Sequence, residues 1–209
     1  MSAAESSQLQ PKQADPDTTT RVGGWLFRHR TLIPVPIAIV LVGLPIDEIP
    51  SSAGLLTAGV AMTLVGEMVR LWAVHHIGVI SRTRSDRLGP LVASGPFALV
   101  RNPLYLGNIA LWVGFALVAR LVWMAPVVII LLGAEYHAIV RWEERLLESR
   151  LGDAYRAYAA RVPRWLPNFR ASPDRLEGTY SWGETLFSER GTLVAIAAGY
   201  LLLWIRLRS

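Results

Sequence analysis

The chain has 209 residues, a length that fits one domain, and hydrophobic residues make up 52% of it against 18% charged residues. The apolar residues are gathered into long runs, which excludes an ordinary soluble domain and indicates an integral membrane protein. The net charge of +5 comes almost wholly from arginines, which flank the apolar runs rather than line one polar face; this favours anionic lipids or an anionic cofactor over nucleic acid. The absence of cysteine excludes disulfides and thiolate chemistry.

The first part of the chain predicts a polar tail and then a short membrane segment. Residues 1–20 are polar and are expected to be a disordered tail, followed by a single membrane domain over 21–209. Trp25, between arginines, indicates an anchor at the membrane interface. The first apolar run extends from Leu32 to about Ile46, and its prolines predict an irregular helix.

The second apolar run, Ala53–Gly78, predicts the clearest membrane-spanning helix. Its small residues, such as Gly59 and Gly66, would let a neighbouring helix approach closely. Glu67 and Arg70 stand three residues apart, so they are expected to pair and lower the cost of charges near the bilayer. The adjacent histidines His75 and His76 point about 100° apart on a helix and therefore do not predict a metal site.

A basic loop follows, and at its end the start of a helix predicts a binding site for an anionic or dipolar molecule. Pro103 fits the first helical position and makes Asn102 a candidate N-cap. The free N–H groups of that first turn face a loop rich in arginines, Arg82 to Arg101. The alternative is a cytoplasmic loop whose arginines only fix the orientation of the protein in the membrane.

Two further apolar runs, Leu104–Ala119 and Leu121–Val140, are separated only by Arg120 and predict a tight helical hairpin. The second helix is expected to continue into the cytoplasm and to end near Gly152, and a short amphipathic helix follows, ended by Val162-Pro163.

The C-terminal part predicts an interfacial segment over 170–190 and a last apolar helix over 191–205. Whether this last helix fully crosses stays open, because two arginines follow it. The predicted fold is therefore an all-α integral membrane protein of about five membrane-spanning helices, with a tight hairpin and a cytoplasmic C-terminal helical segment. The arginine-rich parts, the N-terminus, residues 82–101 and residues 141–190, are expected on the cytoplasmic side of a bacterial inner membrane.

Charged side chains cluster where the hairpin's second helix leaves the bilayer. Glu144 lies three residues after Arg141 on the same helix face, which predicts a pair. Glu143 lies on another face with Tyr136 and Ile139, and is the better candidate for meeting a substrate or a cofactor ammonium. The alternative is a solvated, self-paired helix end.

Several motifs, read together, resemble the isoprenylcysteine carboxyl methyltransferase and phospholipid methyltransferase superfamily of membrane enzymes. The resemblance covers roughly Ala53–Phe169. Its motifs are Ser94-Gly95-Pro96-Phe97, Arg101-Asn102-Pro103-Leu104-Tyr105-Leu106-Gly107, Glu143-Glu144, Gly152 with Tyr155 and Tyr158, and Arg161-Val162-Pro163 with Leu166-Pro167.

The resemblance implies transfer of a methyl group from S-adenosylmethionine, bound on the cytoplasmic side, to a lipophilic or lipid acceptor that enters from the bilayer. It implies that Glu143, Glu144 and Arg141 serve catalysis. The implied cofactor-binding residues are Arg82, Gly89, Pro90, Leu91, Val92, Phe97, Arg101, Asn102, Pro103, Leu104 and Tyr105.

Two positions depart from the family pattern. Asn102 stands where the family usually has a histidine, and asparagine can hydrogen-bond but cannot titrate. Ile139 stands where the prenylcysteine enzymes have an arginine, four residues before the glutamate, so a prenylcysteine carboxylate is not the expected acceptor. Two alternatives remain: an NADPH-dependent membrane reductase of sterol-like substrates, and a non-catalytic membrane scaffold of the same fold.

Overall fold

The computed structural model describes residues 18–44, 53–77, 91–170 and 181–208, and over these residues it contains helices and no strands. The helices are α1 (Thr18–Arg28), α2 (Pro34–Gly43), α3 (Ala53–Ile77), α4 (Pro96–Leu99), α5 (Pro103–Val118), α6 (Met124–Leu151), α7 (Asp153–Arg161) and α8 (Trp182–Arg208). The prediction of an all-α membrane protein is confirmed. Of the described helices, α3, α6 and α8 are long and apolar enough to cross a membrane, while α2 and α5 are shorter apolar helices.

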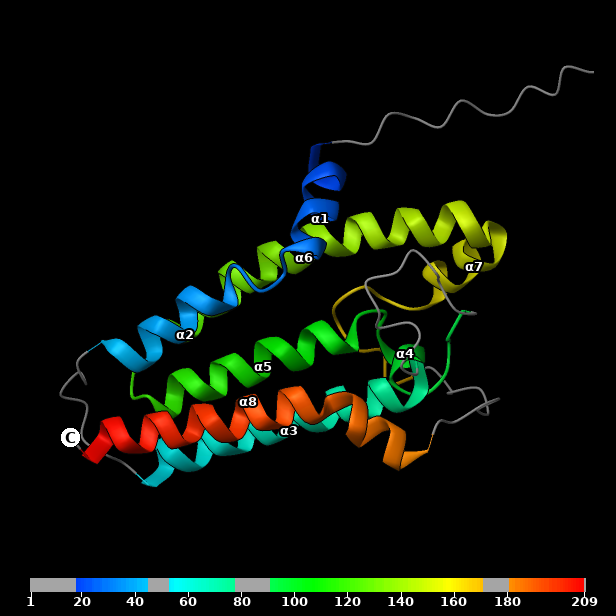
Figure 1. Cartoon of the computed structure of the whole chain (residues 1–209). Helices are drawn as coiled ribbons and strands as arrows, with labels where there is room; N and C mark the ends of the chain where they lie inside the picture. The colour runs from blue at the N-terminus through cyan, green and yellow to red at the C-terminus, as the bar shows by residue number, and fades with distance from the viewer. Residues whose placement is uncertain (1–17, 45–52, 78–90, 171–180, 209) are drawn as a thin grey trace, which may run out of the picture.

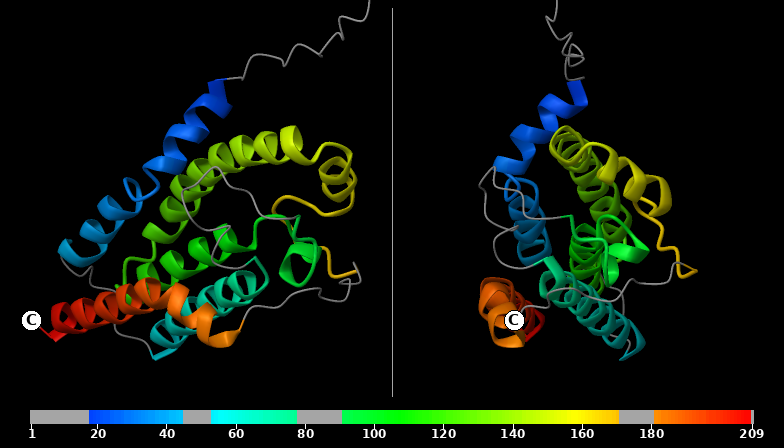
Figure 2. Two further views of the ribbon diagram at one scale, coloured as in Figure 1. Left: turned by 45° about the vertical axis from the view of Figure 1, so that its right-hand side comes forward. Right: turned by 90° about the vertical axis from the view of Figure 1, so that its right-hand side faces the viewer.

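The apolar helices run along one another with α5 in the middle, α6 and α2 on one side and α3 and α8 on the other (Figure 1). The turn between α5 and α6 lies at one end of this bundle, and α4 and α7 lie at the other. Two further views show α8 on the outside of the bundle next to α3 (Figure 2). Only 6% of the most apolar stretch of α8 is buried inside the protein, as expected of a helix whose apolar side chains face lipid.

The close contact between α3 and α5 is made by glycines. A Cβ atom on Gly66 would lie 2.6 Å from the carbonyl oxygen of Gly107, and one on Gly59 would lie 2.9 Å from that of Gly114. Side chains at these positions would force the helices apart. The small residues predicted to admit a neighbouring helix do so, and that neighbour is α5.

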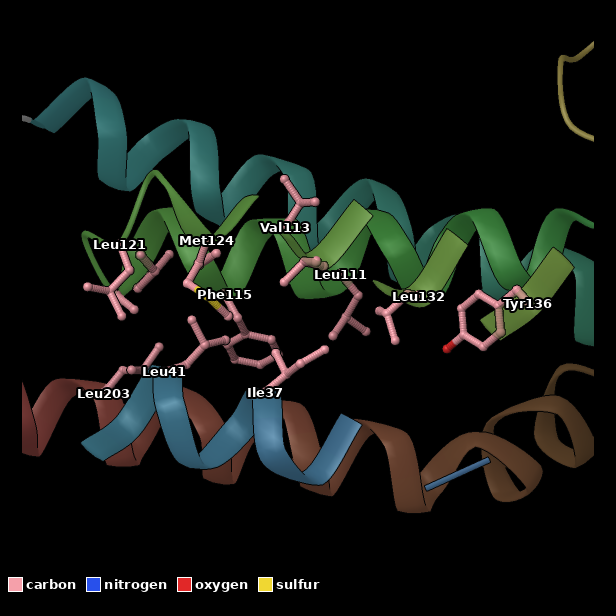
Figure 3. Close-up of a cluster of buried hydrophobic side chains, with 14 of the residues drawn as sticks. Ile37, Leu41, Leu111, Val113, Phe115, Leu121, Met124, Leu132, Tyr136 and Leu203 are labelled. Carbon is pink, nitrogen blue, oxygen red and sulfur yellow. The ribbon is translucent and has the colours of Figure 1, made fainter. Parts of the chain in front are cut away.

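Between α5, α6, α2 and α8 the side chains form the main apolar core (Figure 3). Phe115 of α5 and Leu132 of α6 are buried there together with Ile37 of α2 and Leu203 of α8. The short helix α2 begins at Pro34, which is tolerated at a helix start because its missing N–H has no helical partner there. The expected first membrane segment of residues 32–46 is thus a helix of ten residues, and its end beyond residue 44 lies outside the described residues.

The predicted hairpin between α5 and α6 is confirmed. Arg120 has a φ of +62°, the only positive φ outside glycine among the described residues, and its N–H donates to the Leu117 carbonyl at 3.0 Å. The helix after the turn begins at Met124 and continues without a break to Leu151. Gly152, with a φ of +53°, ends it where predicted, and α7 follows directly.

The C-terminal part differs from the expected division at Gly191. One continuous helix, α8, begins at Trp182 and joins residues 182–190 of the segment expected at the interface to the last apolar run, while residues 171–180 of that segment lie outside the described residues. Its first turn is capped by Ser181, whose hydroxyl accepts from the Glu184 N–H at 3.1 Å, while the Glu184 carboxylate accepts from the Ser181 N–H at 3.1 Å. This reciprocal cap explains why the helix starts well before its apolar stretch.

Candidate functional site

Two loops come together at the end of the bundle that holds α4 and α7. The segment before α5 and the segment after α7 are joined by backbone hydrogen bonds, from the Arg101 N–H to the Pro163 carbonyl and from the Asn168 N–H to the Leu99 carbonyl, both 2.9 Å. The Tyr158 hydroxyl of α7 donates to the Phe97 carbonyl at 2.8 Å. Motifs that lie far apart in the sequence are therefore brought together at this end of the bundle.

The turn before α4 is fixed by glycine. Gly95 has a φ of +57°, a conformation that other residues rarely adopt, and the ring of His76 packs against the place where a Cβ would stand. This brings the end of α3 against the loop and leads into α4, where Phe97 is buried. Phe97, one of the residues expected to bind cofactor, is thereby held at the end of the bundle.

Glu144 is held by arginines from both loops. Arg101 Nη1 lies 2.8 Å from one of its carboxylate oxygens, and Arg164 approaches both oxygens, with Nη2 at 2.5 Å. The hydrogen bonds to Glu144 raise the pKa of the Arg164 guanidinium. Sequence spacing predicted Arg141, on the same helix, as a partner of Glu144. Arg101 and Arg164 reach Glu144 from other parts of the chain, and Arg164 was not predicted.

Glu143 lies beside the aromatic side chains of α5 and α6. The Tyr105 hydroxyl lies 3.0 Å from each carboxylate oxygen of Glu143, and the Tyr105 ring stacks on Tyr136 with 4.6 Å between ring centroids. The prediction that Glu143 shares a face with Tyr136 agrees with this arrangement. Arg30, between α1 and α2, also acts electrostatically on Glu143 and stands over the Phe27 ring at 5.2 Å, a contribution that the sequence did not indicate.

The start of α5 agrees with prediction in position but not in capping. Pro103 is the first helical residue and Asn102 the N-cap residue, yet the Asn102 side chain makes no capping hydrogen bond. Its Nδ2 instead donates to the Arg164 carbonyl at 3.1 Å, which ties the helix start to the segment after α7. The first-turn N–H groups of α5 are therefore not satisfied by this side chain and can donate to a ligand oxygen.

The other predicted residues fall into two groups. Arg82, Gly89 and Pro90 lie outside the described residues. Leu91, Val92, Leu104 and Arg141 are half-buried, and Leu91 packs against the buried Tyr155 and Tyr158 of α7. Within the described residues no group of three or more His, Cys, Asp or Glu side chains is arranged to hold a metal ion.

Residues 55–154 match the model of the phospholipid methyltransferase family. The chain belongs to this family. It is 32% identical over 178 residues to the nickel-cobalt-cadmium resistance protein NccN of Alcaligenes xylosoxydans xylosoxydans, with 82% of this chain and 78% of that protein covered. It is 29% identical over 165 residues to the cobalt-zinc-cadmium resistance protein CzcN of Cupriavidus metallidurans, covering 78% and 70%.

No solved structure matches the chain. The family match includes α5 and α6 and ends at residue 154, so Arg164 and α8 lie beyond it. The family match therefore does not cover most of α7, Arg164 or α8. Their contacts with the matched region are shown by the structure alone.

The residues around the start of α5 are chemically suited to S-adenosylmethionine, which carries a carboxylate and an ammonium group. The Nε of Arg101 is buried and has no hydrogen-bond partner among the described residues, so it can donate to a carboxylate. The first-turn N–H groups of α5 could donate to the same anion, and Glu143 could accept from an ammonium. The donor set thus fits the cofactor that the family implies.

Proposed function

We propose that this protein transfers a methyl group from S-adenosylmethionine to a lipophilic acceptor at the cytoplasmic face of the membrane. The observation that carries the proposal is the meeting of Tyr105 and Glu143 next to the Arg101–Glu144–Arg164 cluster, within a chain of the phospholipid methyltransferase family. These residues join the start of α5 to the end of α6, at the membrane end where a lipid headgroup and a water-soluble cofactor can meet.

Each group has a role that follows from its contacts. S-adenosylmethionine, when bound, supplies an electrophilic methyl group attached to a sulfonium sulfur. Arg101 and the first turn of α5 would hold its carboxylate. Glu143, held by the Tyr105 hydroxyl, would orient the acceptor and take the proton that the acceptor loses on methylation. Glu144 would brace the two arginines rather than react.

Calorimetric titration of the purified protein with S-adenosylhomocysteine and with NADPH tests the cofactor. Binding of S-adenosylhomocysteine alone supports methyl transfer. Binding of NADPH alone would favour the membrane reductase, and binding of neither would favour the scaffold. Tyr105→Ala should weaken binding while the protein stays folded in detergent, and unchanged affinity would contradict the proposed pocket.

The acceptor can be found with tritium-labelled S-adenosylmethionine and a total lipid extract of the host membrane. A labelled lipid that requires the wild-type protein, and is lost with Glu143→Gln, would identify the acceptor class. Label appearing only in the aqueous fraction would contradict a lipophilic acceptor.

We also infer a role in metal tolerance, supported by the names of the two relatives. On this proposal the protein contributes by modifying a membrane component. A metal-sensitive strain carrying the wild-type gene should then grow at higher nickel, cobalt or cadmium concentrations than one carrying Glu143→Gln at equal protein level. Equal tolerance in both strains would separate the metal phenotype from methyl transfer.

A further inference from the structure

A second buried polar cluster lies deeper in the membrane region, between α3 and α8. Its centre is Arg70 of α3, which is 6% exposed. Its Nε lies 3.1 Å from Glu67, as the sequence predicted, and its Nη2 lies 2.6 Å from the fully buried Glu189 and 3.0 Å from Thr192, both on α8. Arg70 is thus one of the groups that fix α8 to α3.

The same arginine reaches α5. Arg70 Nη1 donates to the side-chain oxygen of Asn108, which lies one helix turn after Tyr105. Arginine can only donate hydrogen bonds, so the amide oxygen of Asn108 must face Arg70 and its NH₂ group must face the other way. Asn108 is in turn hydrogen-bonded to the side chain of Tyr136. With the amide oriented in this way, Asn108 is the donor and the tyrosine oxygen accepts.

Tyr136 completes a connection to the candidate site. Its ring stacks on Tyr105, and the Tyr105 hydroxyl donates to Glu143. The contacts therefore run without interruption from Glu189 through Arg70, Asn108, Tyr136 and Tyr105 to Glu143. The residues that make these contacts are buried or half-buried, and burial makes a misplaced polar partner costly.

We propose that Asn108 is a positioning residue for Glu143, and that Arg70 sets its orientation, so that the docking of α8 is coupled to the geometry of the candidate reactive carboxylate. The coupling is a property of the contacts and can be measured without any acceptor. Its effect on turnover rests on the proposed function.

Stability measurements test the coupling itself. Glu189→Gln and Glu143→Gln change the two ends of the connection, and their shifts in melting temperature, measured singly and together in detergent, should not add. Tyr200→Phe is the matched control, because it removes a different hydrogen bond between α8 and α3, from Tyr200 to Thr63 at 2.9 Å, and leaves Arg70 untouched. Its shift should add to that of Glu143→Gln, as expected for independent sites.

The proposal is overturned if the shifts of Glu189→Gln and Glu143→Gln add, as those of Tyr200→Phe and Glu143→Gln are expected to. It is also overturned if both pairs depart from additivity by the same amount. If Glu189→Gln does not fold, Thr192→Val replaces it, since it removes only one hydrogen bond from Arg70. The same criterion then decides the outcome.

Kinetics with tritium-labelled S-adenosylmethionine and the host lipid extract test the role of Asn108. Asn108→Asp can still accept from Arg70 but cannot donate to Tyr136. It should lower kcat about tenfold or more, because small misplacements of reacting groups cost rate, with little change in KM for S-adenosylmethionine. Tyr200→Phe should keep the wild-type kcat.

An unchanged kcat in Asn108→Asp would overturn the positioning role. Absence of methyl transfer by the wild-type protein would instead contradict the proposed function, and the stability measurements would then decide the coupling alone. The two failures are therefore distinguishable.

Discussion

Glu143 and Glu144 are adjacent in sequence but have different surroundings, and their substitutions should have different effects. Glu143 accepts from a tyrosine, whereas Glu144 accepts from two arginines. Glu143→Gln keeps the shape and removes the charge, so methyl transfer should fall about 100-fold or more if Glu143 takes the acceptor's proton. The melting temperature should shift less than in Glu144→Gln. Full activity in this variant would leave the pair with a structural role only.

Glu144→Gln should affect stability instead. The side chains of Glu144 and Arg101 are 14% and 15% exposed, so their ion pair is only partly screened by water. Removing the charge leaves two arginines facing each other without a counter-ion, which should cost about 1–3 kcal/mol of unfolding free energy. Denaturant unfolding in detergent measures this, and Glu148→Gln, which removes an exposed ion pair with Arg156 from the same helix, provides a comparison. A loss no larger than in that variant would contradict the bracing role.

Glu135, on α6, is a residue whose environment the sequence did not reveal. It is 2% exposed, and neither of its carboxylate oxygens has a hydrogen-bond partner among the described residues. A buried carboxyl group without partners is destabilising, so Glu135→Leu should raise stability by about 1–3 kcal/mol. A lower melting temperature in liposomes would instead show that this carboxyl gains a partner in the membrane.

Single residues also show where sequence reasoning succeeds. Glu67 and Arg70 pair because they lie on one helix, where spacing fixes the distance. Arg164 and Glu189 meet their partners across 20 and 119 residues, and nothing in the local pattern indicates such contacts. The composition of the candidate site was therefore predictable only as far as it lies within single helices and known motifs.

At the level of elements, the contact between α3 and α5 depends on a lack of side chains. Gly59→Val would place methyl groups where the Gly114 carbonyl and Val118 now lie, so it should cost about 1–3 kcal/mol or more. Gly133→Ala on α6 is the control, because nothing lies within 4 Å of its added Cβ, and it should be neutral or slightly stabilising. Melting temperatures in detergent compare the two, and equal shifts would contradict the close contact.

At high pH, helix α7 should lose the stabilisation that its buried Tyr155 provides. Burial raises the pKa of Tyr155 from its ordinary value of 10.0 to about 12. The stabilisation from the neutral, buried tyrosine is complete below pH 10 and is lost as the pH rises through 12, because the unfolded chain ionises first. Melting temperature should therefore fall between pH 10 and 12, and less steeply in Tyr155→Phe. Identical pH profiles would show that other groups are responsible.

The helices themselves were largely predictable, but the positions where some of them begin were less so. Long apolar runs, Pro103 and Gly152 mark helix bodies and ends, since they act locally. The start of α8 at Trp182 was missed because its first turns are polar, and a cap at Ser181 rather than hydropathy begins the helix. A search for a serine followed three residues later by glutamate could have found it.

At the scale of the whole molecule, two arginines at the end of α8 conflicted with the expected orientation. Arg206 donates to the Leu41 carbonyl at 2.5 Å, and Arg208 stands 4.0 Å from the centre of the Trp204 ring. Their charges are thus used in contacts with α2 and with the helix itself. These contacts account for how the two charges are accommodated at this end of the molecule.

Orientation can then be tested at two described positions. Of the arginine-rich parts that the structure describes, the end of α6, α7 and the start of α8 lie at the end of the bundle that holds α4, so this end is expected in the cytoplasm and the turn between α5 and α6 on the opposite side. Leu166→Cys, at a position 80% exposed, and Val122→Cys, at one 38% exposed, introduce single thiols into a chain that has none.

A membrane-impermeant maleimide added to intact spheroplasts should label Val122→Cys and should label Leu166→Cys only after lysis. The wild-type chain serves as the blank, because without cysteine it cannot react. Labelling of Leu166→Cys in intact spheroplasts would show that the orientation is the opposite of the expected one. It would also remove the candidate site from the compartment that holds S-adenosylmethionine, so the same experiment bears on the proposed function as well as on the fold.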